Sequence, residues 1–346
     1  MIDNDNFLIE DFESLNQKKY RQRTINSHIF HSLEWMEIVK ETLGISYKVA
    51  TLKDNNITLA SIPFVNYLNL IKGPCALPLQ FSGYHGSIVS DNDKIKSMIL
   101  SRFFEYCINK KLYTQFPETN LIHGHQSFSG YSIYKMDINQ NSSVEEQVLS
   151  SASKRMRNYI KQALRSDLIS KTGGLELLDT FYFLYLQNMK ELGTPPFPKK
   201  YFKKIIEYFP HLAKIILVES KRKKFCSSMF VLKVSDKELF ARAISTPRLY
   251  QAEQSSHLIY MEAARVAQGL GCSVMNFGRS IDGSGPALFK QRYGLKAIPQ
   301  LIYSPYKKWT VTDPNKSLLR YAVKIWRRLP IPLTKVGGMM FAKHVM

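Results

Sequence analysis

Long apolar runs and paired cysteines are both missing from this sequence. No segment offers the roughly 18 consecutive apolar residues that cross a bilayer, so we predict no transmembrane helix. The N-terminus is acidic and lacks a basic region followed by an apolar run, so we expect no signal peptide. The cysteines are far apart, which argues against a zinc ribbon or a disulfide framework: Cys75, Cys107, Cys226 and Cys272. These absences predict a cytoplasmic protein.

Acidic residues are also scarce. The chain has 48 Lys and Arg against 28 Asp and Glu, which gives a formal net charge of +20. The imbalance is strong in residues 287–346, which hold twelve Lys or Arg and a single acid, Asp313. A basic surface favours anionic partners such as tRNA, anionic lipid, nucleotide or acidic polysaccharide. The alternative is a solvated surface without a specific partner.

Several catalytic patterns are absent as well. The sequence has no P-loop, no Ser-His-Asp arrangement around G-x-S-x-G and no convincing pair of carboxylates. His123 and His125 flank Gly124 without an acid or a cysteine at ligand spacing. We therefore predict no metal site and no tightly bound cofactor.

Capping and turn residues predict individual elements. A helix should begin after Ser32, a favourable N-cap residue, and end at Gly44. Strands are expected at 47–52 and 57–67, separated by a tight turn. The second half of the chain shows a similar order of helices and strands, and residues 143–165 are expected to form a single basic helix.

The segment Asn276–Tyr303 concentrates special backbone positions and fixed cations. A short apolar strand leads into the glycine-containing loop Gly278–Gly285, a cationic helical turn and a second apolar strand. Glycine lets a backbone approach a ligand closely. Arg279, Lys290 and Arg292 can hold a carboxylate, a phosphate or a developing oxyanion. The segment is therefore our first candidate for a binding site.

A set of residues in this segment matches a known signature in type and spacing: Phe277, Gly278, Arg279, Ser280, Gly285, Phe289, Lys290, Tyr293, Gly294 and Tyr303. The set resembles the C-terminal signature of the FemAB-like branch of the GNAT acyltransferase superfamily. The resemblance extends upstream through residues 191–198 and the basic helix around Arg155. It is closest to FemAB-like proteins found beside exopolysaccharide and exosortase systems. Asn276 stands where that family has Asp, which removes one charge.

The resemblance implies a mixed α/β (α+β) fold of two tandem GNAT-like units. Each unit would be a mostly antiparallel mixed sheet flanked by helices. We expect the N-terminal unit at 26–142 and the C-terminal unit, which carries the motif, at 143–310. Residues 1–25 are expected to be a loosely held leader, and 311–346 a basic amphipathic tail.

The family match also suggests roles for individual residues. Lys290 and Tyr293 share a helix face, so Lys290 could bind the carbonyl or a phosphate of the donor while Tyr293 passes a proton to the leaving group. The alternative is a packed helix with a solvated Lys290. Four residues around the glycine loop are candidate substrate contacts: Gly278, Arg279, Ser280 and Gly285. Arg242 and Ser245, on the expected strand 238–246, are two more, although Arg242 could instead pair with a structural carboxylate such as Glu253 or Glu262.

The acyl donor is left open between two classes. CoA-dependent relatives carry a glycine-containing loop that binds pyrophosphate at a helix N-terminus. The equivalent segment here, Arg248–His257, has no glycine, and Glu253 would repel phosphate. FemAB-like enzymes use aminoacyl-tRNA, and the positive charge of this chain suits that donor.

Two basic helices are candidates for anion or membrane binding. Lys154, Arg157 and Lys161 fall on one face of the first helix, where a phosphate backbone or a lipid headgroup could bind. The second, 315–329, is amphipathic and has a basic face: Arg320, Lys324 and Arg327, with neighbouring cations. The alternatives are a solvated face for the first helix and a core-covering face for the second.

Together these patterns predict an N-acyltransferase. It would move an aminoacyl or acyl group onto an amine of a sugar, peptidoglycan or other cell-envelope precursor, in some cases lipid-linked. It would act in the cytoplasm, with a peripheral contact to the inner face of the membrane through 315–329. The alternatives are an acyl-CoA-dependent GNAT acetyltransferase and a non-catalytic GNAT-fold module that binds anionic polymer or membrane.

Overall fold

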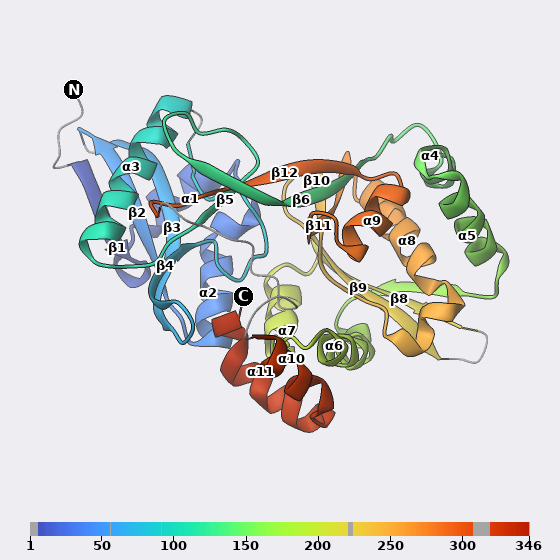
Figure 1. Cartoon of the computed structure of the whole chain (residues 1–346). Helices are drawn as coiled ribbons and strands as arrows, with labels where there is room; N and C mark the ends of the chain where they lie inside the picture. The colour runs from blue at the N-terminus through green and yellow to red at the C-terminus, as the bar shows by residue number, and fades with distance from the viewer. Residues whose placement is uncertain (1–5, 56, 91, 221–223, 307–318, 346) are drawn as a thin grey trace. The chain divides into compact units, whose positions relative to one another are not determined.

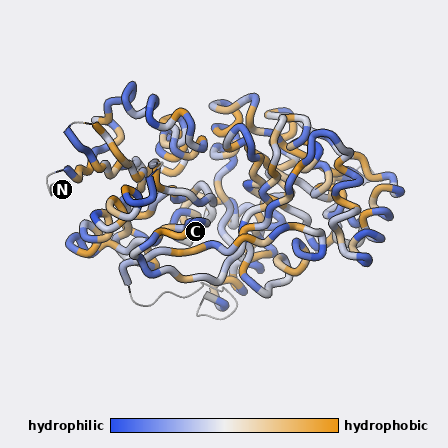
Figure 2. The backbone as a smooth tube through the Cα atoms, turned by 90° about the horizontal axis from the view of Figure 1, so that it is seen from above, coloured by the Kyte–Doolittle hydropathy of each residue, from blue (hydrophilic) through white to orange (hydrophobic). Residues whose placement is uncertain are grey.

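The computed structural model describes residues 6–55, 57–90, 92–220, 224–306 and 319–345 (Figure 1). The chain forms two compact units. Unit 1 comprises Met1–Tyr131 and Pro299–Thr310, and unit 2 comprises Ser132–Ile298 and Val311–Val345. The boundaries therefore differ from those expected at 142 and 310, because a C-terminal segment returns to unit 1. Hydrophobic and hydrophilic residues alternate along the chain in both units (Figure 2).

Unit 1 is built on an antiparallel sheet in the order β1-β2-β3-β4. Helix α3 packs on β2 and β3 through buried side chains that include Ile99 and Phe103. The elements of this unit are β1 (Phe7–Asp11), α1 (Gln17–Thr24), α2 (Leu33–Leu43), β2 (Tyr47–Asp54), β3 (Ile57–Asn69), β4 (Gly73–Pro78), α3 (Asp93–Asn109) and β5 (Phe116–Glu118).

The expectation of a loosely held leader is wrong for the described part of residues 1–25. Strand β1 pairs with β2 from Phe7↔Leu52 to Asp11↔Lys48. Phe12 and Tyr20 are buried. Side chains of this segment therefore complete the core of unit 1, although its many charged residues suggested a solvated arm.

Unit 2 contains most of the second sheet. The strand order of this sheet is β5-β12-β6-β11-β10-β9-β8-β7. The strands are β6 (Ser127–Asp137), β7 (Ile169–Gly173), β8 (Ala213–Glu219), β9 (Phe225–Lys233), β10 (Glu238–Ser245), β11 (Val274–Ile281) and β12 (Lys296–Tyr303). The helices are α4 (Val144–Ser151), α5 (Lys154–Arg165), α6 (Leu178–Leu192), α7 (Lys199–Tyr208), α8 (Ser255–Gly269), α9 (Gly285–Arg292), α10 (Leu319–Arg328) and α11 (Ile331–Val345). Strand β5, the N-terminal residues of β6 and the C-terminal residues of β12 belong to unit 1.

Helices cover both faces of the sheet in unit 2. Phe230 on β9 contacts Phe181 of α6 and Phe202 of α7. Its neighbour Met229 belongs to the core cluster that contains Ile259 of α8. Successive residues of a strand point to opposite faces, so α6 and α7 lie on one face and α8 on the other. Helices α4 and α5 pack on α8, and α10 and α11 pack on α6.

One predicted feature of unit 2 is wrong in detail. Residues 143–165 form two helices, α4 and α5, separated at Ala152 and Ser153. Ser153 starts the second helix by accepting a hydrogen bond from the Met156 N–H at 3.4 Å. The described part of the expected basic amphipathic tail, 311–346, forms two helices, α10 and α11.

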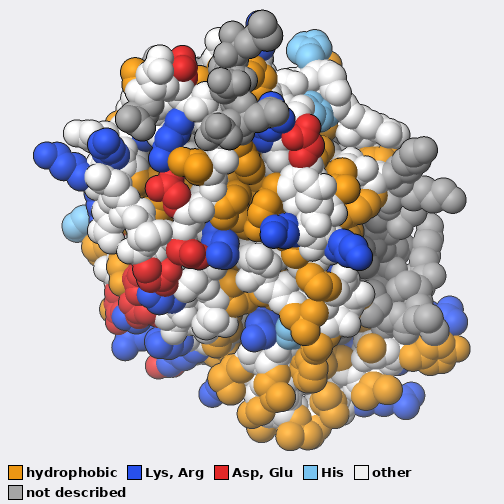
Figure 3. Space-filling model, turned by 90° about the vertical axis from the view of Figure 1, so that its left-hand side faces the viewer, with side chains coloured by type: hydrophobic (Ala, Val, Ile, Leu, Met, Phe, Trp, Pro, Cys, Tyr) orange, Lys and Arg blue, Asp and Glu red, His pale blue; other side chains and the backbone are white. Residues whose placement is uncertain are grey.

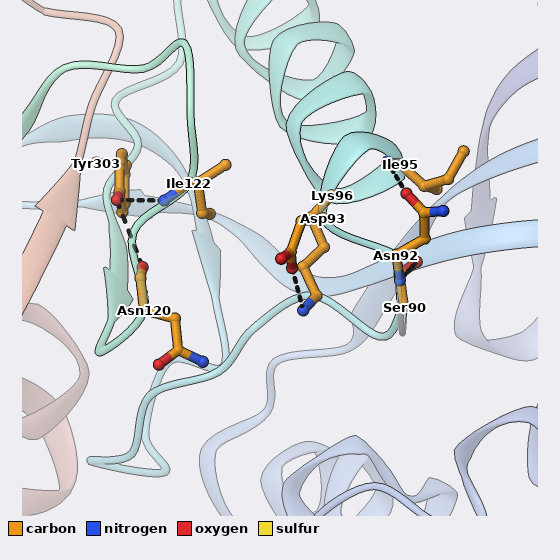
Figure 4. Close-up of polar contacts among 8 residues, drawn as sticks. All are labelled: Ser90, Asn92, Asp93, Ile95, Lys96, Asn120, Ile122 and Tyr303. Atoms are coloured by element: carbon orange, nitrogen blue, oxygen red, sulfur yellow. Dashed lines mark hydrogen bonds and ion pairs between the residues drawn. The ribbon is translucent and has the colours of Figure 1, made fainter.

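Tyr303, the last residue of the sequence signature, completes unit 1. Strand β12 pairs with β5 through Leu301↔Glu118, Ile302↔Pro117 and Tyr303↔Phe116. The Tyr303 hydroxyl accepts the Ile122 N–H at 2.7 Å and donates to the Asn120 carbonyl at 3.4 Å (Figure 4). The ring is fully buried. A residue distant in sequence thus supplies hydrogen-bond partners to the backbone of the loop between β5 and β6.

Candidate functional site

Two parallel strands separate at the centre of unit 2. Strands β10 and β11 pair through three residue pairs, from Glu238↔Val274 to Phe240↔Asn276. Both strands continue beyond the Phe240↔Asn276 pair, and their described residues form no further pairs with each other. On its other edge β10 pairs with β9, where the register shifts between Ala241 and Ala243 and leaves Arg242 as a bulge residue. Beyond this point, the edge of β10 that faces β11 has no paired strand among the described residues.

Asn276 fixes the point of separation. Its buried side chain donates from Nδ2 to Glu238 Oε1 at 2.7 Å and accepts the Gly278 N–H on Oδ1 at 2.8 Å. Glu238 Oε2 is ion-paired with Lys135 Nζ at 2.7 Å. Gly278 has φ +71°, which favours glycine. An amide can donate to Glu238 and accept from Gly278, whereas an ionised Asp can only accept.

Lys290 lies beneath β11 and is 5% exposed. Its Nζ donates to the carbonyls of Phe277 at 2.7 Å and Gly278 at 3.0 Å, and lies 5.3 Å from the centre of the Tyr134 ring. Burial lowers the pKa of Lys290 to about 7. Lys290 was expected either to be solvated or to bind the donor. In the structure its ammonium group donates to the backbone carbonyls at and before Gly278, the residue with positive φ.

Tyr293 is also internal. Its hydroxyl donates to the His257 carbonyl at 2.9 Å, and its ring packs against Tyr260 and Phe289. Burial raises the pKa of Tyr293 well above its usual value. This position does not support Tyr293 as the proton donor, because its hydroxyl is fully buried and already bonded to backbone. Lys290 thus anchors α9 to β11, and Tyr293, the C-cap residue of α9, anchors the end of this helix to α8.

The other motif residues are distributed along β11 and the start of α9. Gly278, Arg279 and Ser280 lie within the strand, which runs to Ile281, so the expected loop is shorter than Gly278–Gly285. Arg279 is exposed and Ser280 is buried. Gly285 begins α9 after the N-cap residue Ser284, whose side chain accepts the Ala287 N–H at 3.3 Å.

Arg242 has an aromatic environment. Its Nε donates to the Tyr201 hydroxyl at 3.2 Å, and its guanidinium lies 4.8 Å from the centre of the Phe197 ring. Glu262, one of its suggested partners, is bonded to Arg265 instead. Ser245 is buried opposite Ser228, and among the described residues its Oγ has no hydrogen-bond partner. Arg242, Ser245 and Arg279 are not among the residues that line the pocket described next.

A pocket of about 550 Å³ opens beside these elements, between α5, α8, α9 and the end of β10. Its walls are largely apolar and aromatic: Met156, Tyr159, Ile244, Tyr260, Pro286, Leu288 and Phe289. Arg155 and Arg292 supply cations, and Thr246, Ser256 and His257 supply polar groups. Gly285 is the predicted substrate contact that lines it. An apolar cavity with a few polar groups and two arginines suits a ligand with a hydrophobic arm and an anionic end.

His257 stands in the first turn of α8. Its Nδ1 lies 3.3 Å from the Gln254 carbonyl, and its ring contacts those of Tyr159 and Phe289. A carbonyl only accepts, so Nδ1 carries the proton and Nε2 of the neutral ring is a base. Burial lowers the pKa of His257, which keeps the ring neutral at pH 7. The sequence gives no signal for His257, because the segment Arg248–His257 stands out only by its lack of glycine.

The start of α8 differs from a glycine-rich phosphate loop, as the sequence indicated. Residues Arg248–Glu253 form a 3-10 turn, and Gln254 precedes α8 with φ +55° and no side-chain cap. Ser255 Oγ lies 2.7 Å from Ser227 Oγ, which lies 2.8 Å from Thr246 Oγ1. This buried hydroxyl chain joins the helix start to the strand end at the pocket.

The basic face predicted on α5 is only partly available. Lys154 and Lys161 are exposed, whereas Arg157 donates to the Ala152 carbonyl at 3.2 Å and helps to end α4. Arg155, on the same helix, lines the pocket and donates from Nε to the Tyr159 hydroxyl at 3.0 Å. The α5 cation that lines the pocket is therefore Arg155, which is not one of the three residues of the predicted basic face. Arg320, Lys324 and Arg327 lie exposed on α10, and positions 315–318 of the predicted helix fall outside the described residues.

No protein-family model and no curated protein matches this sequence. Solved structures do match its fold. The crystal structure of FemX superposes with a TM-score of 0.62 at 12% identity, covering 91% of this chain and 99% of that chain. The C-terminal domain of a putative lysylphosphatidylglycerol synthetase from Agrobacterium fabrum gives 0.56 at 10% identity, covering 84% and 91%. A tandem GNAT protein from the clavulanic acid biosynthesis pathway gives 0.50 at 7% identity, covering 88% and 99%.

The fold is that of tandem GNAT proteins. Two units with sheets flanked by helices confirm the predicted fold class. At these identities the likeness establishes architecture alone. The expected association with exopolysaccharide or exosortase systems stays a prediction.

Proposed function

We propose that the chain transfers an acyl or aminoacyl group onto an amine, with the donor held in the α5–α8–α9 pocket. One observation carries the proposal. A neutral histidine, two arginines and apolar walls meet beside the point where β10 and β11 separate. The GNAT-like fold supports the same reaction class.

In this scheme, the arginines bind the phosphates of the donor and the apolar walls hold its organic arm. The acceptor amine attacks the acyl carbonyl carbon. A C–N bond forms, and His257 Nε2 takes the amine proton. The tetrahedral intermediate then collapses as the C–S bond of a thioester or the C–O bond of an ester breaks, and the leaving thiolate or alkoxide takes up a proton. A backbone N–H on the unpaired edge of β10 is the oxyanion donor that we propose.

Both donor classes fit this chemistry. Acyl-CoA and the 3′ end of aminoacyl-tRNA each combine phosphates with an activated acyl group, and the positive charge favours tRNA. For the acceptor we retain an amine of a sugar, peptidoglycan or lipid-linked envelope precursor. The non-catalytic module stays the alternative, because Lys290 and Tyr293 already have backbone partners.

The first test is donor binding. Acetyl-CoA, charged tRNA and uncharged tRNA would be titrated into the purified protein at physiological salt. Leu288→Trp, which fills the pocket, should weaken binding of the true donor about tenfold or more. Ile108→Trp, an exposed position on α3, is the matched control. Equal binding of any polyanion by both variants would favour the module.

The second test is turnover. With the preferred donor and an amine acceptor, His257→Ala should lower kcat by a factor of about 100 or more. The loss should shrink as pH rises, because hydroxide can then take the proton that His257 takes in wild type. Unchanged kcat in His257→Ala would contradict the assignment of the base.

A further inference from the structure

Helices α10 and α11 are attached to unit 2 by close contacts of small residues. A Cβ added at Gly338 would lie 2.6 Å from the Pro196 carbonyl oxygen, and one at Gly193 would collide with Val323 of α10. On α11, Thr334, Gly338 and Ala342 are buried and follow one another at four-residue spacing. This stripe faces α6 and its C-terminal loop, so the opposite face of each helix points away from the unit.

The outward faces carry large apolar side chains. Leu333, Val336 and Met340 lie opposite the buried stripe of α11, and each is more than half exposed. On α10, Tyr321 and Ile325 are exposed at i, i+4 spacing. This pattern is the reverse of an ordinary surface helix, whose large apolar residues face the core. Figure 3 shows hydrophobic side chains gathered at the lower end of one face, at the height of α10 and α11 in Figure 1.

Cations surround this apolar face. The described segment 319–345 contains no Asp or Glu and six basic residues: Arg320, Lys324, Arg327, Arg328, Lys335 and Lys343. Lys324 and Arg328 follow the same side of α10 as Ile325. A contiguous apolar patch edged by cations of one sign complements a bilayer surface that carries anionic headgroups. Among the described residues, no helix has both the length and the apolar character needed to cross a bilayer.

We propose that the α10–α11 face docks on the surface of an anionic bilayer. The side chains of Tyr321, Ile325, Leu333, Val336 and Met340 enter the boundary between headgroups and acyl chains, and the basic residues contact the headgroups. The face includes α11, which lies beyond the membrane contact expected from sequence at 315–329. The inference is independent of the proposed acyl transfer.

The test is vesicle flotation of the full chain. Wild type should float with phosphatidylcholine–phosphatidylglycerol vesicles and not with phosphatidylcholine alone. Leu333→Ser/Met340→Ser should lower the apparent affinity about tenfold or more, since the apolar contact of both side chains is lost. Ile325→Ser on the other helix should act in the same direction. Lys324→Gln/Arg328→Gln should cause a loss of about tenfold or more.

A matched control removes apolar residues elsewhere. Leu68 and Leu70, at the β3–β4 turn, are exposed to a similar extent, and Leu68→Ser/Leu70→Ser should leave flotation unchanged. Absence of wild-type flotation would overturn the proposal. So would full binding by both apolar variants, Leu333→Ser/Met340→Ser and Ile325→Ser, which would indicate adsorption by charge alone. A dimer that Leu333→Ser/Met340→Ser dissociates, without any vesicle binding, would assign the face to a second copy of the chain.

Discussion

Asn276 shows how one atom of difference sets a buried network. An Asp at this position would place a carboxylate 2.7 Å from Glu238 Oε1, where the Asn276 amide now donates. It would also compete with Glu238 for Lys135, the cation that is ion-paired with Glu238. The asparagine therefore suits this chain because Glu238 already supplies a negative charge at this point.

Asn276→Asp should destabilise unit 2 at pH 7 by about 1–3 kcal/mol, because a buried carboxylate loses its donor and gains a like charge. The loss should lessen toward pH 5, where a proton shared between the two carboxylates restores a hydrogen bond. Chemical denaturation at both pH values measures the effect. Asn158→Asp, at an exposed position on α5, is the control. Equal stability of both variants at pH 7 would contradict the network.

Glu118 gives unit 1 a pH dependence. Its buried carboxylate accepts the Ser87 N–H at 2.7 Å, and burial raises its pKa from 4.5 to about 7. The folded state therefore holds a proton that the unfolded chain has released. The stabilising contribution is complete below about pH 4.5 and is lost as pH rises through 7.

Glu118→Gln should remove this dependence while retaining an oxygen that accepts from Ser87. Relative to the variant, wild type should lose roughly 3 kcal/mol of stability between pH 5 and pH 8. Urea denaturation across this range measures the difference. Glu105→Gln, on the exposed part of α3, should keep the wild-type slope. A variant with the same slope as wild type would show that another group titrates.

At the scale of elements, Gly294 allows the end of α9 to pack closely against the end of α4. Gly294 follows α9 with φ +91°, and a Cβ there would lie 2.5 Å from the Ser151 carbonyl oxygen. Ser153 N–H donates to the Arg292 carbonyl at 2.9 Å in the same region. The glycine of the Tyr-Gly pair in the motif is therefore needed for close packing between the two helix ends.

Gly294→Ala should cost at least about 2 kcal/mol of stability, from strain and from the clash. Gly271→Ala separates the two effects, because Gly271 has φ +70° and open space around its added Cβ. Thermal denaturation of both variants compares them. Equal losses would mean that backbone conformation alone accounts for the glycine.

Elements with strong local signals could be predicted from the sequence. The N-cap Ser32 and the left-handed Gly44 bound α2 as expected, and β2 and β3 begin at the predicted residues. Strand β1, the break between α4 and α5, and helix α11 were missed, since each depends on tertiary contacts. The burial of Lys290 and Tyr293 could not be predicted for the same reason. Type and spacing place Lys290 on α9 and Tyr293 at its end, but burial and backbone partners are set by β11 and α8.

At the scale of the molecule, unit 1 is not a continuous segment. Tyr303 reaches its core from the far end of the motif. Tyr303→Phe should leave the buried Ile122 N–H without its acceptor and cost about 1–3 kcal/mol. Hydrogen exchange at the Ile122 amide should accelerate tenfold or more, whereas Tyr321→Phe on α10 should leave it unchanged. Unaltered exchange in Tyr303→Phe would assign the protection to backbone packing alone.

The return of β12 also sets the order in which the chain can mature on the ribosome. Residues 1–131 are made first, yet their last strand partner is made after nearly all of the sheet of unit 2. Residues 1–131 therefore stay without this strand partner until the other strands of unit 2 have been synthesised. The two units reach their final form almost together, and neither can be excised at a simple linker.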